Sequence, residues 1–146
     1  MRAISTNHTN TDYEEPDMIE GSCLCGAVKY AVDSEPQPMG HCHCRTCRKA
    51  HSAAFSTVMA VSHSVFSWVQ GERELNSFES SPGKKRYFCR VCGSHLVAQR
   101  DDRILLRAGS IDTPIAEKPK VHIWRSDAAA WYDPKDQLPE LPQGIG

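Results

Sequence analysis

Apolar and polar residues alternate along several short stretches of the chain, and a period of two is typical of β-strands. The alternation is clearest over residues 27–32, where Val28, Tyr30 and Val32 share one face, and over residues 55–61. Shorter stretches with the same character predict further strands over residues 65–69, 73–78, 86–88, 95–99, 103–108 and 121–125.

Prolines and glycines interrupt this pattern at short intervals, so we expect loops over residues 33–40, 80–83 and 109–120. Residues 45–54 contain neither Pro nor Gly and predict one short helix. We find no internal repeat and no long amphipathic helix. Short strands with frequent breakers favour a mainly β fold.

The two ends of the chain differ from its middle. Residues 1–20 are rich in Thr, Asn, Asp and Glu and predict a poorly ordered N-terminal tail. We expect one folded domain over residues 21–125 and a proline-containing C-terminal extension over residues 126–146. The chain has no apolar run of about 18 residues and no apolar segment near its start, so we expect a cytoplasmic protein without a membrane span.

Composition limits the classes of partner. The chain has 146 residues, a formal net charge of -1 and an isoelectric point near 6.6. A charge so close to zero argues against a dedicated nucleic-acid surface. Hydrophobic residues make up 40% of the chain and aromatic residues only 8%, so the core is modest and bound metal could supplement it.

All seven cysteines fall into three short clusters. The clusters are Cys23-Leu24-Cys25, His41-Cys42-His43-Cys44-Arg45-Thr46-Cys47 and Cys89-Arg90-Val91-Cys92. Clustered thiolates are the usual ligands of zinc. Disulfides are the weaker interpretation, because the cysteines are odd in number and no export signal is apparent.

Seven ligands divide into a closed structural site of four and an open site of three. One division assigns Cys23, Cys25, Cys89 and Cys92 to the closed site and leaves Cys42, Cys44 and Cys47. Another joins Cys44 and Cys47 to Cys89 and Cys92. The first closes a longer loop and leaves its open site beside Arg45, Arg48 and Lys49, but the residues alone leave both divisions open.

Each of these assignments has a simpler alternative. A histidine could close the second site, and His41, His43 and His51 are near enough in sequence to do so. His43 lies between two cysteines, where a strand-like backbone would point it away from the metal and toward a supporting role. Arg45, Arg48 and Lys49 are equally compatible with a solvated helix face.

Three motifs together resemble the glutathione-dependent formaldehyde-activating enzyme family. They are Gly21-Ser22-Cys23-Leu24-Cys25-Gly26, Cys42-His43-Cys44-Arg45-Thr46-Cys47-Arg48-Lys49 and Phe88-Cys89-Arg90-Val91-Cys92-Gly93-Ser94, with weaker matches over residues 107–112 and 121–124. The resemblance implies an Mss4-like β-tent of short antiparallel strands stapled by zinc, with a short helix near the second cluster. It also implies the first division of ligands, with Cys42, Cys44 and Cys47 as the catalytic triad.

The family's reaction joins glutathione and formaldehyde into S-hydroxymethylglutathione, so the resemblance implies a carbon–sulfur lyase with a small-molecule thiol and aldehyde as partners. On this hypothesis the glutathione sulfur becomes the fourth zinc ligand, and Arg45, Arg48 and Lys49 bind the glutathione carboxylates. A homo-oligomer is compatible with the sequence. The alternative function is a non-catalytic, zinc-stabilised protein-interaction module. Nucleic-acid binding through zinc knuckles and redox chemistry at Cys89 and Cys92 are weaker interpretations.

Overall fold

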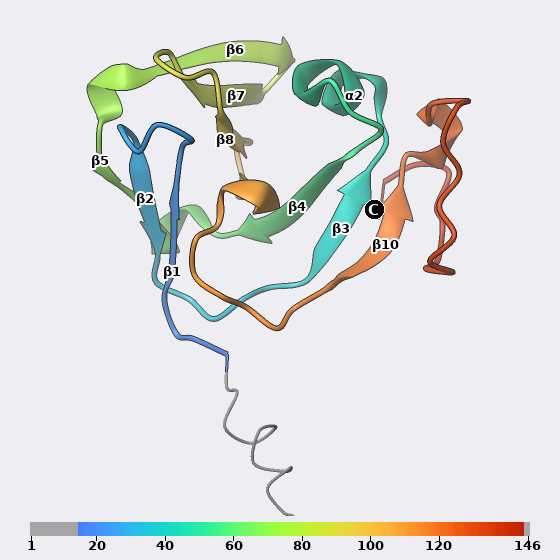
Figure 1. The fold of residues 1–146 in the computed structure, drawn as a ribbon, viewed down its shortest axis with the longest axis horizontal. Coiled ribbons are helices and arrows are strands. Elements are labelled where there is room, and N and C mark those ends of the chain that lie inside the picture. Colours follow the sequence, from blue (N-terminus) through green and yellow to red (C-terminus); the bar gives the residue numbers. More distant parts are fainter. Residues whose placement is uncertain (1–14, 145–146) are drawn as a thin grey trace, which may run out of the picture.

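The computed structural model describes residues 15–144, and these residues form two β-sheets with one α-helix (Figure 1). The first 14 residues of the expected N-terminal tail lie outside the described residues. The prediction of a mainly β fold is confirmed.

Three strands form the smaller sheet, in the order β1-β2-β5. They are β1 (Ile19–Ser22), β2 (Lys29–Val32) and β5 (Phe66–Gln70). Both pairs are antiparallel. The aromatic rings of Tyr30, Phe66 and Trp68 pack against one another on this sheet, with centroids 5.0–6.2 Å apart.

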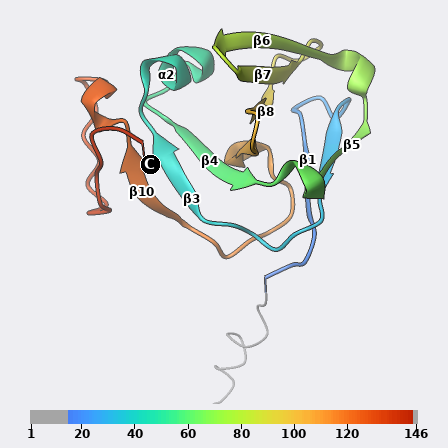
Figure 2. The same cartoon turned by 180° about the vertical axis from the view of Figure 1, so that it is seen from behind.

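Seven strands form the larger sheet, in the order β10-β3-β4-β9-β8-β7-β6. Their bounds are β3 (Met39–Cys42), β4 (Ser56–Val61), β6 (Leu75–Ser81), β7 (Lys84–Cys89), β8 (His95–Gln99), β9 (Ile104–Arg107) and β10 (Pro119–Ile123). All neighbours are antiparallel except β10 and β3, which are parallel. The two opposite views show the helix α2 (Arg45–His51) beside the β6–β7 end, between β3 and β4 along the chain (Figures 1 and 2).

The core lies between the two sheets and collects inward-facing residues of most strands. Its fully buried members include Ile19, Tyr30, Met59, Leu96 and Leu106. The same cluster contains Cys23 and Cys89, so the first and third cysteine motifs are anchored in the core rather than on a free loop.

Several expected boundaries were wrong. Strand β1 lies partly within the expected tail, because Ile19 is an isolated apolar residue whose burial depends on pairing with Val32. Strand β3 occupies the end of the expected loop over residues 33–40, where Gly40 and the prolines gave no strand signal. Strand β6 continues to Ser81, which shortens the expected loop over residues 80–83.

The helix is also shorter than expected. It ends at His51 because Ser52 adopts a left-handed conformation, with φ 51°. The Ser52 N–H bonds the carbonyl of Arg48, and Ala53 bonds the same carbonyl at 3.2 Å. Such a cap ends a helix without a glycine.

The C-terminal segment is ordered along the edge strand β10. The His122 N–H donates to the Pro139 carbonyl at 2.9 Å, and the Leu141 N–H donates to the His122 carbonyl at 2.8 Å. The extension therefore covers one edge of the large sheet. Among the described residues, no helix has both the length and the apolar character needed to cross a membrane.

Candidate metal centres

Two tight turns present the first and third cysteine motifs. After Cys23 the chain reverses at Gly26, and after Cys89 it reverses at Gly93; both glycines have φ near +80°. In each turn a backbone N–H points at sulfur: Val28 donates to Cys23 Sγ at 3.2 Å, and Val91 donates to Cys89 Sγ at 3.3 Å. Amides aimed at sulfur favour the thiolate form, which is the form that binds metal.

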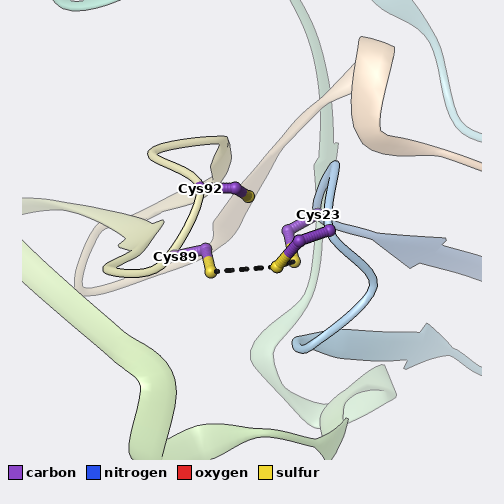
Figure 3. A group of neighbouring side chains, drawn as sticks. Cys23, Cys89 and Cys92 are labelled. Carbon is purple, nitrogen blue, oxygen red and sulfur yellow. Dashed lines mark hydrogen bonds between the residues drawn. The ribbon is translucent and has the colours of Figure 1, made fainter.

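The two turns bring four sulfur atoms together. The ligand atoms of Cys23, Cys25, Cys89 and Cys92 all lie within 4.8 Å of one another. Figure 3 shows the labelled side chains pointing toward a common centre from the two turns. The Ser94 side chain and backbone lower the pKa of Cys92 to about 5, so that thiol is already ionised at neutral pH.

The spacing of these sulfur atoms fits zinc. Sγ of Cys25 lies 3.7 Å from that of Cys23 and 3.9 Å from that of Cys89. Four thiolates at the usual zinc–sulfur distance of about 2.3 Å, arranged as a tetrahedron, would be roughly 3.8 Å apart. The four cysteines therefore match a closed structural site. This grouping is the first of the two divisions considered for the sequence, in which Cys42, Cys44 and Cys47 remain for a second site.

The remaining cysteines meet at the start of α2. Cys44 is the N-cap residue, and its Sγ accepts a hydrogen bond from the Cys47 N–H at 3.4 Å. The three-residue spacing places Cys47 one turn later on the same side. Cys42, at the end of β3, completes a group whose sulfur atoms lie within 4.8 Å of one another.

This triad has no fourth ligand among the described His, Cys, Asp and Glu residues. Thiol hydrogen bonds from Cys42 and Cys44 hold the pKa of Cys47 far below its ordinary value, whereas hydrogen bonds with Cys44 and Cys47 raise the pKa of Cys42. Three protein ligands are typical of an open zinc site, since the fourth position of a tetrahedral ion remains for another ligand.

A cavity of about 910 Å³ opens onto the triad. All three triad cysteines line it. Six cationic residues line it as well, whereas Asp127 is the single acidic residue among its described lining. The cations are Arg45, Lys84, Arg100, Arg103, Arg107 and Lys120. The cavity therefore suits an anionic ligand.

Arg107 is the most unusual of these cations. Its side chain is only 4% exposed, and none of its three guanidinium nitrogens has a hydrogen-bond partner within the described residues. Burial lowers the pKa of this guanidinium, whereas the charge of Cys47 opposes that shift. A buried, unpaired charge is costly unless an anion completes it. Arg107 thus indicates an anionic partner at the triad.

The basic residues expected near the triad separate in the structure. Arg45 lines the cavity. Arg48 donates from Nε to the Asp127 carbonyl at 3.0 Å, and Lys49 is exposed on the helix away from the cavity lining. Most cations of the cavity come instead from strands β7, β9 and β10 and the turn between β8 and β9. The sequence did not indicate these cations as site residues, because a single charged residue in a short strand forms no recognisable motif.

The histidines near the triad make other contacts. His43 Nε2 lies 2.8 Å from His122 Nδ1, and His51 packs on His95 with ring centroids 4.8 Å apart. His43 is buried, and burial followed by the charge of Arg125 lowers its pKa to about 4. His122, which the sequence gave no reason to single out, is fully buried at the centre of a polar cluster.

Comparison with known proteins agrees with this architecture. Residues 18–127 match the family model described as glutathione-dependent formaldehyde-activating enzyme. A protein of Halomonas elongata named after the same family is 28% identical over an alignment of 127 residues, and the match covers 80% of this chain and 80% of that protein. A Schizosaccharomyces pombe protein named only as an uncharacterized lyase is 35% identical over 77 residues, covering 53% of this chain and 54% of that protein.

A solved structure shares the fold. The crystal structure of a Rhodobacter sphaeroides protein superposes with a TM-score of 0.54 at 21% identity, over 66% of this chain and 91% of that one. The family model covers well over half of the chain, including all seven cysteines. The chain therefore belongs to the glutathione-dependent formaldehyde-activating enzyme family.

Proposed function

We propose that this protein joins the thiol of glutathione to formaldehyde, forming the carbon–sulfur bond of S-hydroxymethylglutathione, at the Cys42, Cys44 and Cys47 triad. The observation that carries the proposal is the cavity at this triad. It brings three cysteine side chains and six cations together around a space of about 910 Å³, large enough for a tripeptide.

The charges of the cavity match those of glutathione. The tripeptide has two carboxylates and one ammonium group, so it enters as an anion. We assign Arg100, Arg103 and Lys120, which line the cavity, to the carboxylates. Arg103 and Lys120 would exchange their ion pairs with Asp102 (3.7 Å) and Glu117 (3.4 Å) for this contact. Each charge-assisted hydrogen bond of this kind contributes about 1.5–3 kcal/mol. Asp127 is the acidic group available for the ammonium.

Cys42, Cys44 and Cys47 would hold a zinc ion, which when bound would lower the pKa of the glutathione thiol so that the thiol is ionised at neutral pH. In the reaction, the sulfur lone pair forms a bond to the formaldehyde carbon while the carbonyl π electrons move to oxygen. The thiol proton, released on binding, finally returns to that oxygen. We assign Arg107 to the developing alkoxide charge, because its guanidinium is buried near the triad and has no hydrogen-bond partner among residues 15–144.

We place the reaction in the cytoplasm, where glutathione is abundant and cysteines stay reduced. The same cavity could accept a related thiol or aldehyde adduct. A comparison of glutathione with cysteine and 2-mercaptoethanol as thiols tests this point. We expect a preference for glutathione that is reduced about tenfold by Arg103→Gln through an increase in KM.

The decisive experiment follows ¹³C-formaldehyde by NMR with glutathione, measuring product formation above the spontaneous rate. We expect Cys44→Ser to fall to the spontaneous rate while remaining folded. Ala50→Ser, on the same helix but outside the cavity lining, should keep the wild-type rate. Unchanged turnover in Cys44→Ser would remove the triad from the reaction.

A further inference from the structure

We propose that His41, His122 and Asp136 form a further divalent-metal site, made of nitrogen and oxygen ligands and separate from the two cysteine centres. One ligand atom from each residue lies within 4.8 Å of the other two. His41 and His122 face each other on the parallel strands β3 and β10, which run side by side in Figure 1. Asp136 comes from the C-terminal segment.

The site lies apart from the triad although His41 precedes Cys42. Successive side chains of a strand point to opposite faces of the sheet. Cys42 lines the cationic cavity, whereas His41 does not. The ring of His41 packs instead on Phe55, with centroids 4.3 Å apart, and on His122, with centroids 4.8 Å apart.

In both imidazoles, Nδ1 makes a hydrogen bond that fixes the ring. His41 Nδ1 lies 2.8 Å from Thr57 Oγ1, and His122 Nδ1 lies 2.8 Å from His43 Nε2. A metal would therefore bind Nε2 of each ring; in His122 this nitrogen is hydrogen-bonded to the Asp136 carboxylate, and the ion would replace that bond. Histidine ligands of metals characteristically bond a second group through the other ring nitrogen, which fixes the orientation of the ring. Thr57 and His43 provide these supporting contacts.

The separation of the ligand atoms also suits an ion. His122 Nε2 is hydrogen-bonded to the Asp136 carboxylate, 2.9 Å from Oδ2 and 3.2 Å from Oδ1, and an ion between these atoms would displace the shared proton. Two ligands at about 2.1 Å from one ion, at right angles, would be roughly 3.0 Å apart. Imidazole and carboxylate ligands favour zinc, nickel, cobalt or iron in the divalent state over ions that prefer thiolates. The Asp136 side chain is 43% exposed, which leaves the ion a path to solvent and room for water.

Such an ion would fasten the C-terminal segment to the large sheet. This segment already pairs with β10 through both the N–H and the carbonyl of His122. Its Gly144, together with Trp124 at the end of β10, lines the cationic cavity. The metal would therefore hold one wall of that cavity in place.

The test uses the full chain with its cysteine centres filled with zinc, followed by titration with Co²⁺ under calorimetric and optical observation. We expect one additional equivalent of Co²⁺ whose spectrum lacks a thiolate-to-cobalt charge-transfer band. Asp136→Asn should weaken this binding at least tenfold. The matched control is Asp133→Asn, an exposed carboxylate on the same segment that pairs with Arg125 and Lys135 and should bind as the wild type does.

A second variant tests whether a loss of metal binding could come from a change in folding. Thr57→Val leaves all three ligands in place and removes only the group that holds His41, so we expect about a tenfold loss of affinity. The proposal is overturned if the zinc-filled wild type takes up no further Co²⁺, or if Asp136→Asn binds it equally well. A thiolate band accompanying the additional cobalt would equally overturn it, because the ion would then occupy the cysteine triad.

Discussion

Arg86 donates a hydrogen bond from Nη2 to the Sγ of Cys47, over 3.7 Å, and both side chains are buried. The same nitrogen lies 3.0 Å from Thr46 Oγ1, while Nε donates to Ser80 Oγ at 2.8 Å. The guanidinium is therefore fixed on two sides against the start of α2. A cation so placed favours the thiolate of Cys47 over the thiol.

We expect Arg86→Gln to weaken metal binding at the triad about tenfold, because a charge-assisted hydrogen bond to the thiolate contributes about 1.5–3 kcal/mol. Competition with a chromophoric chelator measures the affinity. Arg103→Gln, on an exposed residue of the cavity wall, provides the control and should leave metal affinity unchanged. If the Arg86→Gln variant bound metal at the triad as tightly as the wild type, the contact between Arg86 and Cys47 would serve only packing.

The two cysteine centres should respond differently to the loss of one ligand. Cys92→Ser opens the four-cysteine site, which joins two turns anchored in the core, so we expect it to lower the midpoint of thermal unfolding strongly. Cys44→Ser affects an open site at the edge of a seven-residue helix and should lower the midpoint much less. Thermal denaturation with zinc content per chain measures both. Equal losses of stability would contradict the assignment of one structural and one open site.

Much of this architecture could be predicted because the signals are local. The alternation over residues 55–61 and the strand expected over residues 86–88 correspond to β4 and β7. The cysteine clusters needed only their spacing, since Cys44 and Cys47 meet through one helical turn. The grouping of Cys23 with Cys89 depends on contacts distant in sequence, and there the family resemblance supplied what spacing left open.

Other features depend on tertiary contacts that no local pattern contains. Arg86 and Arg107 are buried charges within strands, where the alternation rule expects apolar residues, and their position reflects the thiolates that they face. His122 is buried through pairing of β10 with β3 and with the C-terminal segment. Ile19 forms part of a strand only because β2 lies beside it.

Gly71 offers a test of the turn between β5 and β6. It has φ +79°, and a Cβ at this position would lie 2.0 Å from the carbonyl oxygen of Ala27. We expect Gly71→Ala to destabilise the fold by roughly 3 kcal/mol, the sum of left-handed strain and backbone displacement. Gly83→Ala is the matched control: its φ is +77°, but a Cβ there meets no atom within 4 Å, so only about 1–2 kcal/mol should be lost. Urea denaturation gives both values, and equal losses would exclude the steric contact with Ala27.

Because of His51, we expect the fold to lose stability in mild acid. Burial, followed by the positive charge of Arg107, lowers the pKa of His51 from 6.5 to about 4, and its Nε2 has no hydrogen-bond partner within the described residues. Because the unfolded chain binds this proton more readily, the stabilisation is present above pH 6.5 and is lost as the pH falls toward 4. Since the site is partly exposed, we expect a loss of about 1 kcal/mol between pH 7 and pH 5 from this group.

Denaturation at both pH values compares the wild type with His51→Gln. In this variant, zinc loss and the titration of other groups still occur, but position 51 can no longer bind a proton. The variant should lose less stability than the wild type, and identical losses would show that His51 is not held neutral by the fold.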